Sequence, residues 1–429
     1  MKNFYLKPKI FDALKGYSGN QFVKDLTAGI IVAIIALPLS IALALASGVE
    51  PAQGIYTAIA AGFFVALFGG SKVQIAGPTA AFATIVAGVV AEQGMDGLFI
   101  ATVIAGIILI LMGILKLGSL IRLIPKTVTV GFTGGIAVTI LVGQIKDFLG
   151  ITYGEGVKPI ETFEKIKANI DHISSFKWEA LLIGVISLAV LIFYTRLEKK
   201  IPPSLIAVIL GALLVGLVPV FSNNVSTIGV LYDIPKGLPK VDLGGMEINA
   251  EKIIAVLPNA VTIALLAGVE SLLSCVVADG MINDKHNSNA ELVGQGIANI
   301  ASVFFGGIPA TGAIARTAAN IKNGGRTPVA GMVHSVVLLL VLLLLMPYAK
   351  LIPMPVIAAI LFVVAYNMSE WRHFVAIYKT KRIDDILVLT VTFVLTVVFD
   401  LVVAIVAGMV LYGITLIIKK LSKKEGAEN

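Results

Sequence analysis

Five ionisable side chains interrupt long apolar runs of this sequence: Glu270, Asp279, Arg316, His334 and Asp400. An ionisable group in an apolar medium is costly and therefore marks a candidate functional site. Asp279 and Asp400 lie at the ends of their runs, where a helix cap or a side chain that reaches for water explains them. We expect His334 to be a hydrogen-bonded interior histidine, with a proton carrier as the alternative. Glu270 and Arg316 are the two residues that need a function.

Glu270 follows a charge-free stretch that begins at Ile253, and Ser274 lies one helical turn after it. Residues four apart share one face of a helix, so both side chains can face the same cavity. A carboxylate and a hydroxyl there can carry a proton or hold a cation. Arg316, expected about two turns into a short helix over 311–323, would attract an anion. A structural ion pair between Glu270 and Arg316 is the alternative.

Two short segments of small residues resemble the starts of broken helices. They run from Gly77 to Ala81 and from Gly312 to Arg316, and each follows a Phe-Gly-Gly sequence. The unpaired amides of a first helical turn carry about half a positive charge. Two such ends that converge make an anion site, and small side chains allow close approach. The sequence therefore predicts a small anion as ligand, rather than a cation or a neutral solute.

Composition indicates the elements that position these residues. Apolar residues make up 57% of the chain and charged residues only 14%, too few charges to cover a soluble protein of this length. Charge-free runs approach the ~20 residues that a membrane-spanning helix needs. We predict about fourteen spans, at 26–46, 52–70, 77–91, 96–116, 126–148, 178–196, 202–221, 253–279, 289–306, 311–323, 326–348, 352–368, 383–400 and 401–419.

The basic residues indicate the orientation of these spans. Lysines in residues 1–25 place the N-terminus in the cytoplasm, and the loops predicted on that side are rich in Lys and Arg. The C-terminus then also lies inside. The net charge of +7 is therefore explained by topology and does not indicate nucleic acid. Residues 1–25 have no apolar core or cleavage site and are not a signal peptide.

The two halves of the chain share an order of features that indicates an inverted repeat. Each half has a Phe-Gly-Gly break, a short small-residue helix, a proline-opened span and a polar amphipathic stretch, at 158–172 and at 369–382. The predicted topology puts these two stretches on opposite sides of the membrane. The expected organisation is a cytoplasmic segment 1–25, a first repeat 26–221, an extracytoplasmic loop 222–252, a second repeat 253–420 and a cytoplasmic tail 421–429.

The sequence lacks the motifs that are typical of several other classes of protein. No G-x-x-x-x-G-K-[ST] sequence for nucleotide phosphates and no H-E-x-x-H sequence for catalytic zinc is present. The single cysteine, Cys275, excludes an intrachain disulfide. We expect neither an enzyme nor a bound cofactor or firm metal site, other than a coupling Na⁺ or H⁺.

Four motifs are distributed over nearly the whole chain: Ala36-Leu37-Pro38 through Gly54-Ile55-Tyr56, Gly77-Pro78-Thr79, Glu270-Ser271-Leu272-Leu273 through Ala278-Asp279, and Arg316-Thr317 with Asn320-Ile321-Lys322-Asn323-Gly324-Gly325-Arg326-Thr327-Pro328. Together they resemble the sulfate permease (SulP) family, which includes the solute carrier 26 anion transporters. The fourth motif is similar to the branch of cyanobacterial bicarbonate transporters.

The resemblance implies an all-α polytopic membrane protein with a seven-plus-seven inverted repeat. It implies a core domain of spans 1–4 and 8–11, a gate domain of spans 5–7 and 12–14, and half-helices at spans 3 and 10. The anion then lies between the starts of those half-helices. Carried over residue by residue, the anion site comprises Thr79, Ala80, Ala313, Ile314, Ala315, Arg316 and, as an apolar wall, Leu43. The site for a coupling cation or proton comprises Glu270, Ser274 and Gly312.

Three departures from the family pattern refine the expected function. Leu39 replaces a polar or acidic residue after the proline of span one, and Ile314 replaces a threonine of the sodium-coupled branch, which favours proton coupling through Glu270. The family usually continues into a cytoplasmic STAS domain, whereas the sequence stops just after Lys423-Lys424: either that domain has been removed or we expect this member to lack it, and a homodimer stays an open alternative. We expect a proton- or sodium-coupled symporter of bicarbonate or sulfate in the cell (inner) membrane, with membrane lipid as partner and an elevator-like movement of the core. The alternatives are an uncoupled anion channel or uniporter, an anion exchanger and a dicarboxylate symporter.

Overall fold

The computed structural model describes residues 5–119, 125–154, 156–157, 159–197, 201–232, 237, 249–399 and 401–425, and helices dominate this part of the chain. In chain order the elements are α1 (Ile10–Ala13), α2 (Gly19–Ala46), α3 (Pro51–Phe68), β1 (Ala76–Gly77), the 3₁₀ helix η1 (Ala80–Phe82), α4 (Ala83–Ile114), α5 (Lys126–Leu149), α6 (Thr162–Asp171), η3 (Ile173–Ser175), α7 (Trp178–Leu197), α8 (Pro203–Leu217), α9 (Pro219–Asn224), α10 (Ile228–Leu231), α11 (Ala250–Ile282), α12 (Ser288–Phe304), β2 (Thr311–Gly312), α13 (Ile314–Lys322), α14 (Val329–Ala349), α15 (Met354–Met368), α16 (Trp371–Lys379), α17 (Ile383–Val398) and α18 (Leu401–Glu425).

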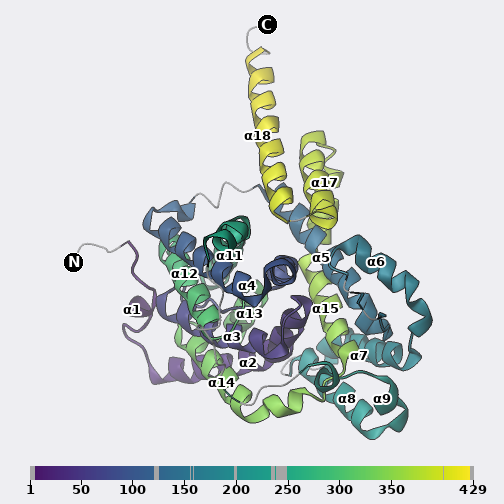
Figure 1. Ribbon diagram of the computed structural model, residues 1–429. Helices are drawn as coiled ribbons and strands as arrows, with labels where there is room; N and C mark the ends of the chain where they lie inside the picture. The colour runs from purple at the N-terminus through teal and green to yellow at the C-terminus, as the bar shows by residue number, and fades with distance from the viewer. Residues whose placement is uncertain are drawn as a thin grey trace.

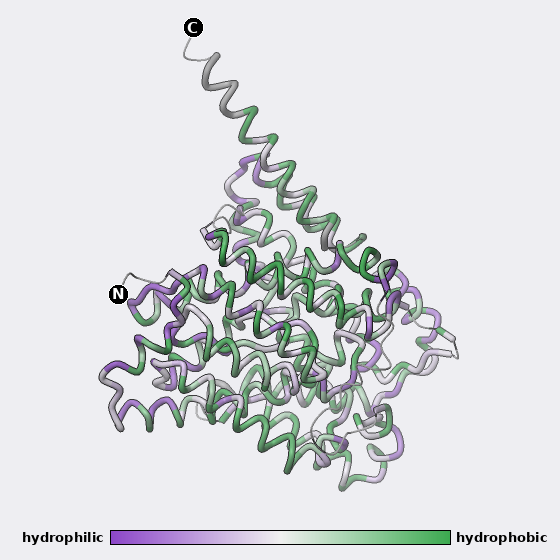
Figure 2. The backbone as a smooth tube through the Cα atoms, turned by 60° about the vertical axis from the view of Figure 1, so that its left-hand side comes forward, coloured by the Kyte–Doolittle hydropathy of each residue, from purple (hydrophilic) through white to green (hydrophobic). Residues whose placement is uncertain are grey.

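The helices confirm an all-α polytopic membrane protein. Seven helical stretches of the described residues are long and apolar enough to cross a bilayer, and three shorter helices are also apolar. Helix α4 contains two of the predicted spans. The two spans are separate segments, because Gly94 has a φ of 71° and breaks the helix between them. Hydrophobic residues fill the middle of the molecule, and hydrophilic residues gather toward its edges (Figure 2).

Some predicted boundaries were wrong. The span predicted over 202–221 ends at Leu217, because a proline at 219 begins the separate helix α9. The half-helix predicted over 311–323 begins only at Ile314, because residues 311–312 form strand β2. Parts of the predicted loop 222–252 form α9 and α10, and Asp400 lies outside the described residues.

The helices pack as two groups. One group contains α2, α3, α4, α11, α12, α13 and α14, and the other contains α5, α7, α8, α15, α17 and α18. Figure 1 shows most of the first group on the left and most of the second on the right, with α18 extending beyond the bundle. These groups correspond to predicted spans 1–4 with 8–11 and 5–7 with 12–14.

Strands β1 and β2 join the two halves of the chain inside the first group. They pair antiparallel, with Ala76 opposite Gly312 and Gly77 opposite Thr311. Each strand leads into a half-helix, so the starts of η1–α4 and α13 are brought together. This antiparallel pairing is the arrangement expected when two repeats of opposite orientation meet.

The extended residues beside these strands need partners, because unpaired backbone groups are costly in a membrane interior. Glu291, which is fully buried, accepts from the amides of Gly70 and Ser71 at 2.8 and 3.2 Å. Asn299 exchanges two hydrogen bonds of 2.9 Å with the backbone of Ala310. Polar side chains of neighbouring helices thus replace the hydrogen bonds that a continuous helix would make.

A second buried carboxylate fixes the loop that follows α13. Asp25 of α2 is 0% exposed and accepts from the Thr327 hydroxyl at 2.6 Å and from the amide of Arg326 at 2.8 Å. It also accepts from Gln21 Nε2 and from the Tyr17 hydroxyl. Burial and the hydrogen bond from the Tyr17 hydroxyl to Asp25 raise the pKa of Tyr17 to about 12, so the phenol stays a donor at neutral pH.

Replacing Asp25 with alanine is expected to destabilise the protein by about 3 kcal/mol, because buried donors lose their shared acceptor. Thermal unfolding in detergent micelles, followed by circular dichroism, measures the change. Asp12→Ala is the matched control: Asp12 is an exposed acid that pairs with Lys7 and Lys15, and it should have little effect. Equal melting temperatures for Asp25→Ala and the unmodified protein would contradict this role.

Candidate functional site

A cavity of about 380 Å³ lies between the two groups of helices. The first group contributes Leu39, Leu43, Pro78, Thr79, Ala80, Glu270, Gly312, Ala313, Ile314, Ala315 and Arg316, and the second contributes Thr133, Val364, Asn367 and Met368, with Glu370 following them. Nine of the ten residues predicted for the anion and coupling sites therefore line one cavity. Ser274 is the exception.

Both half-helices begin at this cavity. Thr79 and Ala313 have extended backbones and precede the first helical residues, Ala80 and Ile314. First-turn amides have no partner within their own helix, so both helices direct partial positive charge at the cavity. The small side chains at 80, 313 and 315 leave these amides accessible to a ligand.

Arg316 adds a full positive charge at the same place. It is the third residue of α13, and therefore lies in its first turn rather than two turns in as predicted, because the helix begins at Ile314. Its Nη2 donates to Ser40 Oγ and to the carbonyl oxygen of Pro78, both at 3.3 Å. Its Nε and Nη1 have no hydrogen-bond partner among the described residues. The side chain is only 1% exposed.

Glu270 of α11 also lines the cavity and accepts a hydrogen bond of 2.9 Å from the Thr79 hydroxyl. No ion pair between Glu270 and Arg316 is present in the described part of the chain, because each has these other partners. The predicted alternative of a structural ion pair is therefore wrong. The cavity instead contains a carboxylate and a guanidinium that are separately held.

Ser274 lies on α11 but does not reach the cavity. Its hydroxyl donates to Gln74 Oε1 at 2.8 Å, and Gln74 Nε2 donates to the Ser271 carbonyl oxygen at 3.0 Å. Thr317 of α13 donates to the amide oxygen of Gln74 at 3.4 Å. Through these hydrogen bonds Gln74 links α11 and α13 to the segment before β1, and Ser274 is one of the residues that form this link.

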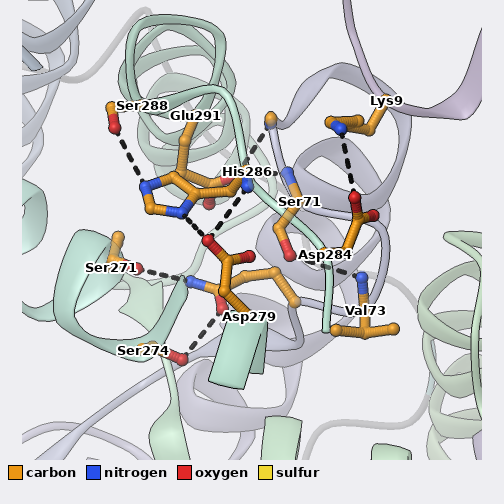
Figure 3. A network of polar contacts seen from close by, with 12 residues as sticks. Lys9, Ser71, Val73, Ser271, Ser274, Asp279, Asp284, His286, Ser288 and Glu291 are labelled. Atoms are coloured by element: carbon orange, nitrogen blue, oxygen red, sulfur yellow. Dashed lines mark hydrogen bonds and ion pairs between the residues drawn. The ribbon is translucent and has the colours of Figure 1, made fainter. Parts of the chain in front are cut away.

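Figure 3 shows this network and its continuation toward the end of α11. Asp279 accepts from the backbone amide of His286 at 3.0 Å and contacts its Nδ1 at 2.7 Å, while Nε2 lies 2.9 Å from the Ser288 hydroxyl. Asp284 pairs with Lys72 at 2.9 Å. These contacts position the α11–α12 connection, so the structure gives Asp279 a structural partner, as expected for a residue at a helix end.

His334 differs from its expected role. It is 0% exposed, but neither ring nitrogen has a hydrogen-bond partner among the described residues. The prediction of a hydrogen-bonded interior histidine was therefore wrong. The ring packs against Gly62, where a Cβ would lie 3.2 Å from Nδ1, so close packing and not hydrogen bonding fixes its position.

Sequence reasoning missed the wall that the second group contributes. Thr133 of α5 and Asn367 of α15 are its polar members, and Glu370 lies at its end. It also missed Ser40, which holds Arg316. Ser40 is an isolated polar residue two positions after Pro38 in an apolar run, a signal that could have been used. Among the described residues, no group of three or more His, Cys, Asp or Glu side chains could hold a metal ion.

Broken helices that meet at a cavity between two helix groups, with a guanidinium and a carboxyl group in its lining, define a multi-span membrane transporter. The sequence matches the model of the sulfate permease family over residues 22–392, and the chain belongs to this family. The Bacillus subtilis (strain 168) protein YvdB is 46% identical over 402 residues, which cover 92% of this chain and 74% of YvdB.

A second relative and a solved structure support this assignment. The bicarbonate transporter BicA of Picosynechococcus sp. is 33% identical over 400 residues, or 90% of this chain and 68% of BicA. The solved transmembrane domain of a cyanobacterial bicarbonate transporter BicA superposes with a TM-score of 0.77 at 31% identity, covering 91% of this chain and 98% of that domain.

Proposed function

We propose that this protein is a secondary active transporter of a small inorganic anion of the sulfate or bicarbonate class. The observation that carries the proposal is Arg316, a buried guanidinium that has no carboxylate partner in the part of the chain that the structure describes, beside two converging helix starts. Its charge and the first-turn amides favour an anion in the cavity. YvdB carries the name "Putative sulfate transporter" and BicA the name "Bicarbonate transporter", which supports this substrate class. Transport requires no enzymatic reaction.

We propose that Glu270 couples uptake to a proton gradient. The carboxylate faces the cavity with a single threonine hydroxyl as side-chain partner, which suits the binding and release of a proton. A sodium ion prefers several oxygen ligands, and neither Ser274 nor Ile314 supplies one at this cavity. Sodium symport, exchange and uncoupled anion movement are the other outcomes of the test below.

We propose that the first group of helices moves as a core against the second. The backbone pairing of β1 and β2 holds both half-helix starts within the first group. A second cavity of about 310 Å³ also lies between the groups, lined by residues that include Thr84, Thr139 and Thr396. Along the first half-helix, buried Phe82 lies between Ala80 of the first cavity and Thr84 of the second. Along α5, buried Ile136 lies between Thr133 of the first cavity and Thr139 of the second. A displacement of the core would carry the site from one cavity toward the other.

We place the protein in the cell membrane with both termini in the cytoplasm, since the basic loops favour that orientation.

The proposed function predicts concentrative uptake in proteoliposomes that contain the purified chain. Labelled sulfate, bicarbonate, chloride and a small dicarboxylate are compared under imposed proton and sodium gradients. One-to-one proton symport would concentrate the anion about tenfold per unit of pH gradient, at zero membrane potential. Equilibration that ignores both gradients would instead indicate a uniporter, and uptake of none of these anions would contradict anion transport.

A further inference from the structure

Helix α16 is a short amphipathic helix between α15 and α17, which correspond to the predicted spans 352–368 and 383–400. One side packs on the second group: the rings of Phe374 and Phe393 lie 5.3 Å apart, and the Tyr378 hydroxyl lies 2.5 Å from the Thr390 hydroxyl. The adjoining edge of the same helix face leaves Trp371 44% and Val375 40% exposed. Because α16 joins two spans, it lies at a membrane surface, where such a side contacts the lipid interface.

Basic residues follow this exposed side. Arg372, Lys379 and Lys381 are exposed, and the ion pairs of the described residues give none of the three a carboxylate partner. Arg372 lies over the Trp371 ring at 5.5 Å. Arg382 is different, because it pairs with Asp385 at 3.1 Å. Three cations beside aromatic residues therefore remain available to an anionic partner.

An open groove of about 540 Å³ runs along the helix and is lined by Phe374, Val375, Tyr378, Lys379 and Lys381. Apolar and aromatic walls with two ammonium groups at one end fit a phospholipid, whose acyl chain is apolar and whose phosphate is anionic. The combination of buried apolar area and cationic side chains is what gives interfacial helices their preference for anionic lipid.

The amphipathic helix of the first repeat, α6, provides a comparison. It also exposes apolar residues, with Phe163 56% and Ile170 66% exposed. Residues 161–171, however, carry three acids against two lysines, whereas residues 370–382 carry one glutamate against four Lys and Arg residues. Basic charge is therefore a property of α16 and not of both amphipathic helices.

We propose that α16 is a binding site for anionic phospholipid, with Lys379 and Lys381 as its headgroup ligands. The site is independent of the transport proposal. It lies next to the cavity, because Glu370 both lines the cavity and directly precedes α16. Lipid bound at α16 would therefore hold one edge of the cavity in place.

Tryptophan fluorescence provides the test, since the chain has only two tryptophans, at 178 and 371. A Trp178→Phe variant leaves Trp371 as the single reporter. It is reconstituted into vesicles of brominated phosphatidylcholine mixed with unbrominated phosphatidylglycerol, and into the reverse mixture. We expect Trp371 quenching to show about a tenfold or greater preference for the phosphatidylglycerol, which two lysines near the surface would provide.

In the same background, Lys379→Gln with Lys381→Gln is expected to reduce this preference to about one. Lys165→Gln with Lys167→Gln on α6 is the matched control and should leave the preference unchanged. Circular dichroism verifies that each variant is folded. Equal quenching by the two lipids before the lysines are replaced, or a preference that survives their replacement, would overturn the proposal. Addition of inorganic phosphate should not reduce quenching, and a loss would identify a site for free phosphate instead.

Discussion

Arg316→Ala is expected to lower anion uptake by at least about a hundredfold, since charge-assisted hydrogen bonds to a desolvated anion are strong. The substitution removes the full positive charge at the cavity and leaves only the partial charges of the helix starts. It also frees Ser40 and the Pro78 carbonyl from their contacts with the guanidinium. Uptake of labelled anion into proteoliposomes measures the loss.

Two variants show whether the loss belongs to the site. Arg316→Lys keeps the charge but not the planar fork, and it should retain partial uptake with a raised KM. Lys322→Ala removes an exposed cation from the last turn of the same helix and should transport normally. Full uptake by a folded Arg316→Ala protein would place the anion site elsewhere.

Glu270→Gln is expected to abolish uptake against a concentration gradient while downhill anion movement persists. Glutamine keeps the shape of the side chain and can still accept from Thr79, but it cannot bind and release a proton. The substitution therefore separates coupling from binding. Uptake is measured with an inward proton gradient, with an inward sodium gradient and with neither.

The matched control is Glu251→Gln, because Glu251 is an exposed glutamate in the first turn of the same helix, α11, and lines neither of the two cavities. It should keep the same response to both gradients as the unmodified protein. If Glu270→Gln still concentrates the anion in a proton or sodium gradient, then coupling depends on another group. If it loses downhill movement as well, then Glu270 acts in anion binding.

Most of the membrane-spanning segments were predictable from the sequence, because a helix surrounded by lipid requires a long run of apolar residues. Charge-free runs of sufficient length identified the spans, and the break of α4 at Gly94 falls in the gap between the predicted spans 77–91 and 96–116. The presence of two half-helices was also predictable, since a segment of small residues follows a Phe-Gly-Gly sequence in each half of the chain.

The partners of the site residues were not predictable in the same way. Thr79 meets Glu270 across 191 positions, and Ser40 meets Arg316 across 276. Hydropathy and periodicity act along one helix and do not specify which residues of distant helices meet. Ser274 illustrates the difference: its spacing from Glu270 was read correctly, but Gln74 from another segment takes its hydroxyl.

The pairing of β1 with β2 has a consequence for how such proteins diversify. The meeting of the two half-helices is secured by main-chain hydrogen bonds and not by contacts between the side chains of β1 and β2. The share of the attraction for negative charge that comes from the helix starts is therefore independent of the side chains around it. Mutation at the lining positions other than Arg316 can change the size and hydration of the pocket while the attraction persists. One scaffold can accordingly acquire new selectivity among anions through single substitutions, without first losing its ability to bind them.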